Sequence, residues 1–140
     1  MASVFTMIIE GELPGRFVWK DDNCVAFLSI NPLSPGHTLV VPRVEIDHWI
    51  DLDDDLLQHL VGVSKKIGEA LSLGFKPVKV AVMIAGLEVP HAHIHVVPMM
   101  GEHDLDVDNA NLAPDPDELD AAADRIRAAL RALGYPEVAG

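Results

Sequence analysis

The sequence predicts an α+β fold, in which a five-stranded antiparallel sheet is accompanied by one long helix and a C-terminal helix. Apolar segments of strand length follow one another through short links, which favours antiparallel pairing. Strands and helices do not alternate regularly, as they would in a protein built from βαβ units. Apolar residues recur with a helical period in only two long stretches. A chain of 140 residues is long enough to bury a real core, and we expect residues 1–140 to form a single domain.

The first 42 residues contain three of the predicted strands. The polar residues 21–23 suit a tight hairpin connection between the first two strands. Residues 31–36 are predicted to form a loop, because this segment contains two prolines and ends in glycine. The elements expected here are a short apolar segment at 5–9 and strands at 17–20, 24–28 and 37–41.

A long helix is predicted in the middle of the chain. The aspartates at 53–55 suit its first turn, because negative charge is favourable at a helix N-terminus, and Gly74 suits its end. Strands at 78–84 and 90–98 are expected to follow and to complete the sheet. The apolar stripe of the long helix consists of Leu56, Leu60, Val63, Ile67 and Leu71.

The last 40 residues are expected to contain a polar loop and a second helix. Asp115 is placed to cap that helix, with Pro116 at its first position and Glu118 placed to close a capping box. Its predicted buried stripe consists of Leu119, Ala122, Ile126, Ala129 and Leu133.

Composition narrows the possible partners and the compartment. Asp and Glu outnumber Lys and Arg by 22 to 10, and a net charge of −12 repels a nucleic acid. No apolar run is long enough to span a membrane, and the N-terminus does not resemble a secretory signal. Cys24 is the only cysteine, which excludes an internal disulfide and predicts a cytoplasmic protein in which this thiol packs in the core.

Three histidines alternate along the last predicted strand. Residues two apart on a strand point to the same side, so His91, His93 and His95 would form a row of imidazoles about 6–7 Å apart. With an ordinary pKa of roughly 6.5, imidazole can act as a nucleophile, a base or an acid near neutral pH. The row could also ligate zinc, or simply form the polar face of a strand, and the residues alone leave these readings open. The residues expected to face the core on the other side are Ala92, Ile94 and Val96.

The chain resembles the histidine triad family. The motif His-x-His-x-His followed by two apolar residues is the signature of that family. Residues 27–32 and 35–42 resemble a second family block, and residues 3–14 resemble the helix with which family members open. The resemblance extends from about residue 3 to residue 100, with the blocks in the family's order, and leaves residues 101–140 as a loop plus the C-terminal helix.

The resemblance implies a nucleotidyl hydrolase or transferase. Its substrate would be a nucleoside phosphoramidate or dinucleoside polyphosphate, attacked at the α-phosphate to give a covalent nucleotidyl-histidine. By position, His93 matches the nucleophile, His91 a residue that orients it, His95 a contact to phosphate oxygens and His37 an auxiliary histidine. Two of these imidazoles could become cationic as the phosphate charge redistributes.

The sequence departs from the family pattern at several positions. Many bacterial members begin with Cys-x-x-Cys, whose thiolates hold a structural zinc, whereas this chain has Ser3 and Thr6 there. Hydroxyl groups are not ordinary zinc ligands, so we expect neither a metal nor any other cofactor. Ser29 replaces an aspartate that grips the ribose, and Leu87 replaces a glutamine on the phosphate side. The substrate contacts expected from the alignment of blocks are Ser29, Ile30, Asn31, Glu88 and Val89.

The resemblance also bears on assembly and on the alternative functions. It implies a two-fold homodimer that buries apolar surface of the long helix, with Leu60, Val61 and Ile67 as candidate interface residues. Besides the second copy of the chain, the expected partner is a nucleotide-type small-molecule substrate. A nucleotide-binding regulatory or adaptor protein with little turnover stays open, as does a His-ligated metal hydrolase. The remaining histidines and the tryptophans are expected at the surface, in the core or at an interface: His48, His59, His103, Trp19 and Trp49.

Overall fold

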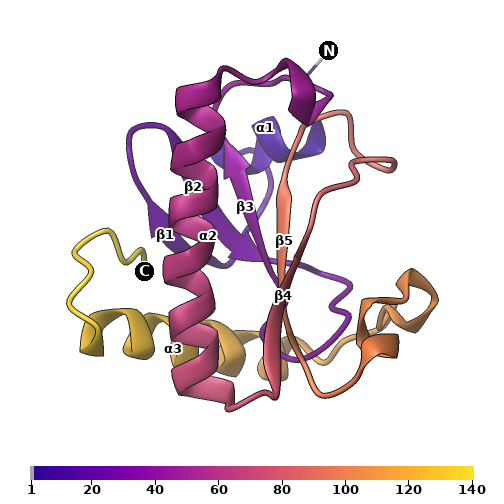
Figure 1. Cartoon of the computed structure of the whole chain (residues 1–140), viewed down its shortest axis with the longest axis vertical. Helices are drawn as coiled ribbons and strands as arrows, with labels where there is room; N and C mark the ends of the chain where they lie inside the picture. Colours follow the sequence, from indigo (N-terminus) through magenta and orange to yellow (C-terminus); the bar gives the residue numbers. More distant parts are fainter. Residues whose placement is uncertain (1) are drawn as a thin grey trace.

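A five-stranded antiparallel sheet forms the centre of the molecule, with strand order β1-β2-β3-β5-β4 (Figure 1). The computed structural model describes residues 2–140. All four neighbouring pairs run antiparallel, which confirms the predicted α+β fold. The strands are β1 (Phe17–Lys20), β2 (Cys24–Leu28), β3 (Thr38–Pro42), β4 (Lys79–Met83) and β5 (Ile94–Met99).

Two helices cover one face of the sheet. In Figure 1, α2 (Asp54–Phe75) runs along the sheet and α3 (Pro116–Ala132) crosses beneath it. The predicted stripe of α2 is largely buried, and it packs with Val40 of β3 and Val96 of β5 in the main core. Leu60 and Ile67 are therefore core residues, so the expectation that they lie at a dimer interface was wrong; Val61 is 53% exposed.

The ends of the two helices differ slightly from the prediction. Asp115 caps α3 by accepting a hydrogen bond from the Asp117 backbone N–H, and Pro116 occupies the first helical position. Leu133 lies just beyond the last turn and is 39% exposed, so the buried stripe ends with Leu130 instead. The left-handed residue that ends α2 is Lys76, with φ of 50°, and not a glycine.

The opposite face of the sheet carries a smaller apolar cluster under the short helix α1 (Val4–Ile9). Phe5 of α1 packs there against Phe27 with a ring separation of 5.5 Å and against the neighbouring strands. This face is only partly covered, because α1 is six residues long. The alternating residues of β2, β3 and β5 that do not enter the main core point to this side.

The histidine segment is less regular than predicted. Strand β5 begins at Ile94, so His91 and His93 lie in the extended segment that leads into it, and only His95 is part of the strand. The predicted alternation nevertheless holds, because Ala92, Ile94 and Val96 belong to the main core. No helix among residues 2–140 combines the length and the apolar character that a membrane crossing requires.

Candidate active site of four histidines

Four histidines gather on the face opposite the two long helices, and Phe5 of α1 packs against His91 and His93. His37 directly precedes β3, and His95 of β5 lies opposite Leu39 of β3 in the sheet register. The rings of His37 and His95 are 5.1 Å apart, and those of His93 and His95 are 4.8 Å apart. The structure therefore brings His37, which is 58 residues from His95 in the sequence, into the same group as the motif histidines.

The backbone fixes the protonation of His93. Its Nδ1 lies 2.7 Å from the carbonyl oxygen of His91. A carbonyl can only accept a hydrogen bond, so Nδ1 carries the proton and the lone pair of Nε2 is left free in the neutral ring. The side chain is only 6% exposed, and the Phe5 ring packs against it edge-on at 4.9 Å. The free Nε2 is the nitrogen that a nucleophilic role requires.

A second backbone group determines, through His37, which ring nitrogen of His95 carries the proton. The Leu33 N–H donates to Nδ1 of His37 at 3.0 Å, so the neutral His37 ring carries its proton on Nε2. That Nε2 lies 2.9 Å from Nδ1 of His95 and donates to it. The proton of neutral His95 must then be on its own Nε2, which is left as a hydrogen-bond donor. His93 and His95 thus offer opposite functions, a lone pair on one ring and an N–H group on the other.

Burial keeps all four imidazoles neutral at pH 7. Desolvation, followed by the charges of His95 and His93, lowers the pKa of His37 to about 3. Desolvation and then His93 lower the pKa of His95 to about 4. Desolvation is also the main cause that lowers the pKa values of His91 and His93. In the free protein, His37 and His95 therefore act as N–H donors; they could become cationic only once an anion is bound beside them.

His91 differs from the other members of the predicted row. It is fully buried, its Nε2 donates to the Pro42 carbonyl at 2.7 Å, and its Nδ1 accepts from the Ser3 hydroxyl at 2.7 Å. Both ring nitrogens are thus occupied within the protein. The resemblance matched His91 to a residue that orients the nucleophile; in the structure its backbone carbonyl accepts from His93 Nδ1, while its own ring faces Ser3 and Pro42.

The expected substrate contacts lie in two segments near the histidines. Ser29, Ile30 and Asn31 follow β2, where Ile30 is exposed and the Ser29 hydroxyl accepts from the Asn31 N–H at 3.2 Å. The Asn31 side chain donates to the Asn111 carbonyl at 3.2 Å, so the segment after β5 holds it. Glu88 is exposed, and its charge opposes the burial that lowers the pKa of His93. Val89 packs against the cluster under α1.

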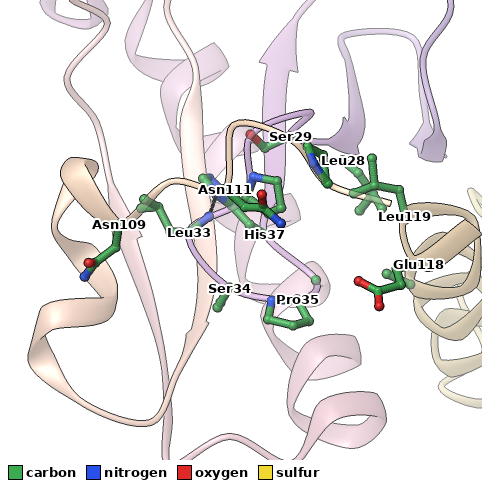
Figure 2. Close-up of a pocket in the computed structure, with 14 residues that line it drawn as sticks. Leu28, Ser29, Leu33, Ser34, Pro35, His37, Asn109, Asn111, Glu118 and Leu119 are labelled. Carbon is green, nitrogen blue, oxygen red and sulfur yellow. Dashed lines mark hydrogen bonds between the residues drawn. The ribbon is translucent and has the colours of Figure 1, made fainter. Parts of the chain in front are cut away.

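A cavity borders the loop that carries Ser29 and His37. It is enclosed by this loop, the 109–114 segment and the start of α3 (Figure 2). Of the predicted site residues, only Ser29 and His37 line it, together with Leu119 and Glu118 of the helix. His93 and His95 are not among its lining residues, and His37 connects it to His95 through the 2.9 Å hydrogen bond.

A metal ion does not fit beside Ser3 and Thr6. Both offer neutral hydroxyls, whereas zinc in proteins is held by thiolate, imidazole and carboxylate groups. The Ser3 oxygen is 2.7 Å from His91 Nδ1, and the Thr6 oxygen is 2.7 Å from Glu45 Oε1. These are hydrogen-bond distances, and the groups satisfy one another without an ion between them.

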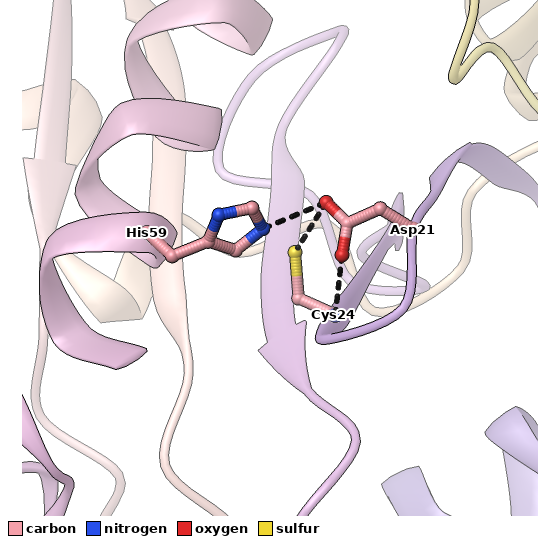
Figure 3. Close-up of side chains that lie close together, drawn as sticks. All are labelled: Asp21, Cys24 and His59. Carbon is pink, nitrogen blue, oxygen red and sulfur yellow. Dashed lines mark hydrogen bonds and ion pairs between the residues drawn. The ribbon is translucent and has the colours of Figure 1, made fainter. Parts of the chain in front are cut away.

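One other group of possible ligand atoms occurs within residues 2–140. The side chains of Asp21, Cys24 and His59 bring these atoms within 4.8 Å of one another (Figure 3). The Asp21 carboxylate already accepts hydrogen bonds from Trp19, His59 and the backbone of the hairpin. Burial, followed by the Asp21 charge, raises the pKa of the Cys24 thiol, which therefore stays protonated. Through the hydrogen bond between His59 and Asp21, the group connects the β1–β2 hairpin to α2. Among the described residues, the histidines of the motif do not form a comparable set of ligand atoms.

Several groups that shape the site had no signal in the sequence. The Leu33 N–H and the Pro42 carbonyl set the proton positions of His37 and His91, and such backbone groups are present whatever the residue type. Glu45 is one of many acidic residues in the chain and has no motif around it. Phe5 is plainly apolar in the sequence, but its contact with His93 depends on the fold.

Comparison with known proteins shows the family to which the chain belongs. Residues 10–102 match the HIT domain family. The sequence is 38% identical over 99 residues to an uncharacterized HIT-like protein of Methanocaldococcus jannaschii, covering 68% of this chain and 77% of the relative. The structure is similar to that of a Zn-bound histidine triad family protein from Mycobacterium smegmatis, with a TM-score of 0.80, 28% identity and coverage of 95% of this chain and 96% of the other.

A second solved structure gives the same result. It is a hypothetical histidine triad nucleotide-binding protein from Sulfolobus tokodaii, with a TM-score of 0.82, 25% identity and coverage of 97% of this chain and 99% of the other. The sequence match and the two structural matches all extend across the histidine motif and the sheet that carries it. The chain belongs to the histidine triad (HIT) family, a superfamily of nucleotide-binding hydrolases and transferases.

Proposed function

We propose that this protein is a nucleotidyl hydrolase or transferase that uses His93 as its nucleophile. The observation that carries the proposal is the 2.7 Å hydrogen bond from His93 Nδ1 to the His91 carbonyl, which leaves Nε2 free in a ring that burial keeps neutral. The substrate class is a nucleoside phosphoramidate or a dinucleoside polyphosphate.

The reaction would proceed by two displacements at the α-phosphorus. The lone pair of His93 Nε2 forms a bond to phosphorus while the bond from phosphorus to the amine or phosphate leaving group breaks, and the leaving group takes up a proton. Water then attacks the same phosphorus, the N–P bond breaks, the water's proton is released and a nucleoside monophosphate leaves. The Nε2–H group of His95 is suited to donate to a non-bridging oxygen whose negative charge grows in each transition state.

Single-turnover labelling of His93 tests this proposal. Incubation of the protein with an adenosine phosphoramidate, followed by acid-free intact-mass analysis, should show one added adenylyl group that maps to His93. His93→Ala should abolish both labelling and turnover while the protein stays folded, and His95→Ala should slow both less severely. His48→Ala is the matched control, because His48 is exposed and outside the site. Near-native turnover by His93→Ala would refute the assignment.

The same assay separates the two alternative functions. A regulatory or adaptor protein would bind the nucleotide and label His93 slowly or not at all, without release of a nucleoside monophosphate. A metal hydrolase would lose activity on chelation, since a metal-bound water would be its nucleophile. We expect full activity in EDTA and no stoichiometric zinc in the purified protein; one tightly held zinc per chain with loss of activity on chelation would favour the metal hydrolase.

A further inference from the structure

We propose that Ser3, Thr6 and Glu45 form a metal-free clamp that positions the nucleophile by fixing the peptide between His91 and Ala92. This inference deepens the proposed function and rests on it. The three residues touch neither the lone pair of His93 nor the expected substrate contacts, so they are positioning residues rather than catalytic ones.

The peptide between His91 and Ala92 is held at both ends. Its carbonyl accepts the hydrogen bond from His93 Nδ1 at 2.7 Å, and its N–H donates to the Ile46 carbonyl at 2.7 Å. A peptide unit is planar, so fixing the N–H end also fixes the direction of the carbonyl. Any tilt of this plane would change the orientation of the His93 ring.

The side chain of His91 is held by the same neighbouring segment. Its Nε2 donates to the Pro42 carbonyl at 2.7 Å, four residues before Ile46. On the other ring nitrogen, Nδ1 accepts from the Ser3 hydroxyl at 2.7 Å, and both side chains are buried. The Ser3 oxygen also accepts from the Thr6 N–H at 3.0 Å, so one hydroxyl caps α1 and binds His91.

Glu45 closes the clamp by joining α1 to the 42–46 segment. One carboxylate oxygen accepts from the Ser3 N–H at 2.6 Å and from the Thr6 hydroxyl at 2.7 Å. The hydrogen bonds from Ser3 and Thr6 hold the pKa of Glu45 below its usual range, so it is ionised at neutral pH. The N-terminus of α1, the 42–46 segment and the His91–Ala92 peptide are therefore connected by hydrogen bonds alone, at the positions where other family members have thiols.

A pair of substitutions at Ser3 separates positioning from helix capping. Glycine is tolerated as a helix cap at a cost of only a few tenths of a kcal/mol relative to serine, but it has no hydroxyl to donate to His91. We expect Ser3→Gly to slow single-turnover labelling of His93 by about tenfold or more, since a misplaced reacting group loses rate steeply, while KM changes little. Ser3→Thr keeps the hydroxyl and should restore most of the rate.

One further variant and a control complete the kinetic test. Thr6→Val removes the donor to Glu45 and should slow labelling in the same direction as Ser3→Gly, by a smaller factor. Ile8→Ala is the matched control, because Ile8 belongs to the apolar packing under α1 and its side chain takes no part in the hydrogen bonds of the clamp. It should lower the unfolding temperature of the protein without lowering the labelling rate. Equal loss of rate in Ile8→Ala and Ser3→Gly would overturn the inference, since general loosening of α1 would then explain both.

A spectroscopic measurement tests the clamp without reference to activity. Long-range ¹H–¹⁵N spectra of the wild-type protein should show His91 protonated on Nε2 and His93 protonated on Nδ1. In Ser3→Gly, the His93 resonances should shift and broaden toward a mixture of tautomers. Unchanged His93 tautomer and labelling rate in Ser3→Gly would overturn the inference. Failure of the wild type to label His93 would instead refute the proposed function, and the tautomer comparison would still test the clamp.

Discussion

At the scale of single residues, two imidazoles whose centres lie 4.8 Å apart present different ring atoms to a ligand because they hydrogen-bond to different partners. His93 donates from Nδ1 to a carbonyl, whereas His95 accepts at Nδ1 from a neighbouring ring that itself accepts from a backbone N–H. The identity of the residue is the same in both cases. Which nitrogen of each ring carries the proton is set by one backbone polar group, and burial removes the charged form of the ring.

The buried histidines should make the protein less stable in mild acid. His37 is neutral when folded and has a pKa of about 3, whereas in the unfolded chain it titrates near its ordinary value of 6.5. Between these values the unfolded state binds the extra proton, so the free energy of unfolding falls as the pH is lowered from about 6.5. Between pH 6 and 4.5, replacing His37 with Gln should reduce the slope of the free energy of unfolding against pH by about 1.4 kcal/mol per pH unit. Urea titrations across this range measure it, with His48→Gln as the exposed control; an equal slope in all three proteins would contradict the assignment.

Because Ser29 stands where an aspartate is usual, the protein should discriminate weakly between ribose and deoxyribose substrates. A carboxylate can accept hydrogen bonds from two adjacent hydroxyls, whereas the Ser29 hydroxyl is uncharged and already accepts from the Asn31 N–H. We expect Ser29→Asp to raise the ratio of kcat/KM for ribo- over deoxyribonucleotide substrates by about 1–3 kcal/mol in free-energy terms. Strong ribose selectivity in the wild type would show that another group makes the contact.

At the scale of elements, the loop before β3 illustrates how one backbone position supports the site. Gly36 has φ of +97°, and a Cβ atom there would lie 3.1 Å from Leu71 and Phe75 of α2. The turn at Gly36 delivers His37 to the histidine group while the glycine passes close to the helix.

Alanine substitutions at two glycines should therefore have opposite effects. Gly36→Ala combines an unfavourable φ with contacts that the packed helix resists, and we expect it to lower the free energy of unfolding by about 1–3 kcal/mol. Gly62 lies inside α2, and a Cβ atom added there would have no neighbour within 4 Å, so Gly62→Ala should raise stability by about 0.5–1 kcal/mol. Chemical denaturation of both variants measures the difference. A neutral Gly36→Ala would show that the loop relaxes without strain.

The elements were largely predictable from the sequence, whereas the contacts between them were not. Strand and helix periodicities placed the sheet, α2 and α3, because an apolar stripe must face a core. The motif identified His93 and His95, but alternation alone could not show that His91 is buried, since that depends on α1 and the 42–46 segment covering it. Leu60, Val61 and Ile67 looked alike as apolar residues of one helix, and only the packing divides the two core residues from the exposed one.

At the scale of the whole molecule, the two edge strands of the sheet differ in their backbone pairing. The edge formed by β1 pairs with the C-terminal segment, through the Trp19–Val138 bridge and backbone bonds from Lys20 to Glu137 and from Ala139 to Val18. Within residues 2–140, the edge formed by β4 has β5 as its one neighbour. Val82 on this strand is 61% exposed. An uncovered edge with an exposed valine is a natural site for pairing with another chain.

We expect the protein to form a homodimer that uses this edge and the neighbouring exposed surface of α2. Light scattering at micromolar concentration should give a mass about twice the 15.2 kDa of one chain. The double variant Val61→Lys and Val82→Lys should shift the mass toward one chain, because both side chains are exposed in the single chain. Val107→Lys is the control, since Val107 is exposed in the connection after β5. A wild-type mass near 15.2 kDa would contradict the expectation.

The register between β3 and β5 has a consequence for how this protein can change by mutation. Leu39 lies opposite His95 and Val40 opposite Ile94, so His95, a residue of the proposed active site, alternates with core residues along the same strand. A slip of one residue would send His95 into the apolar interior and bring Val96 to the face where the other histidines lie. Insertions or deletions within β5 would thus remove activity and solubility together. Substitutions that keep the length of this strand keep its register, so mutational libraries of this kind should include variants that are inactive but well folded. Libraries that change the length should yield few folded proteins of any activity.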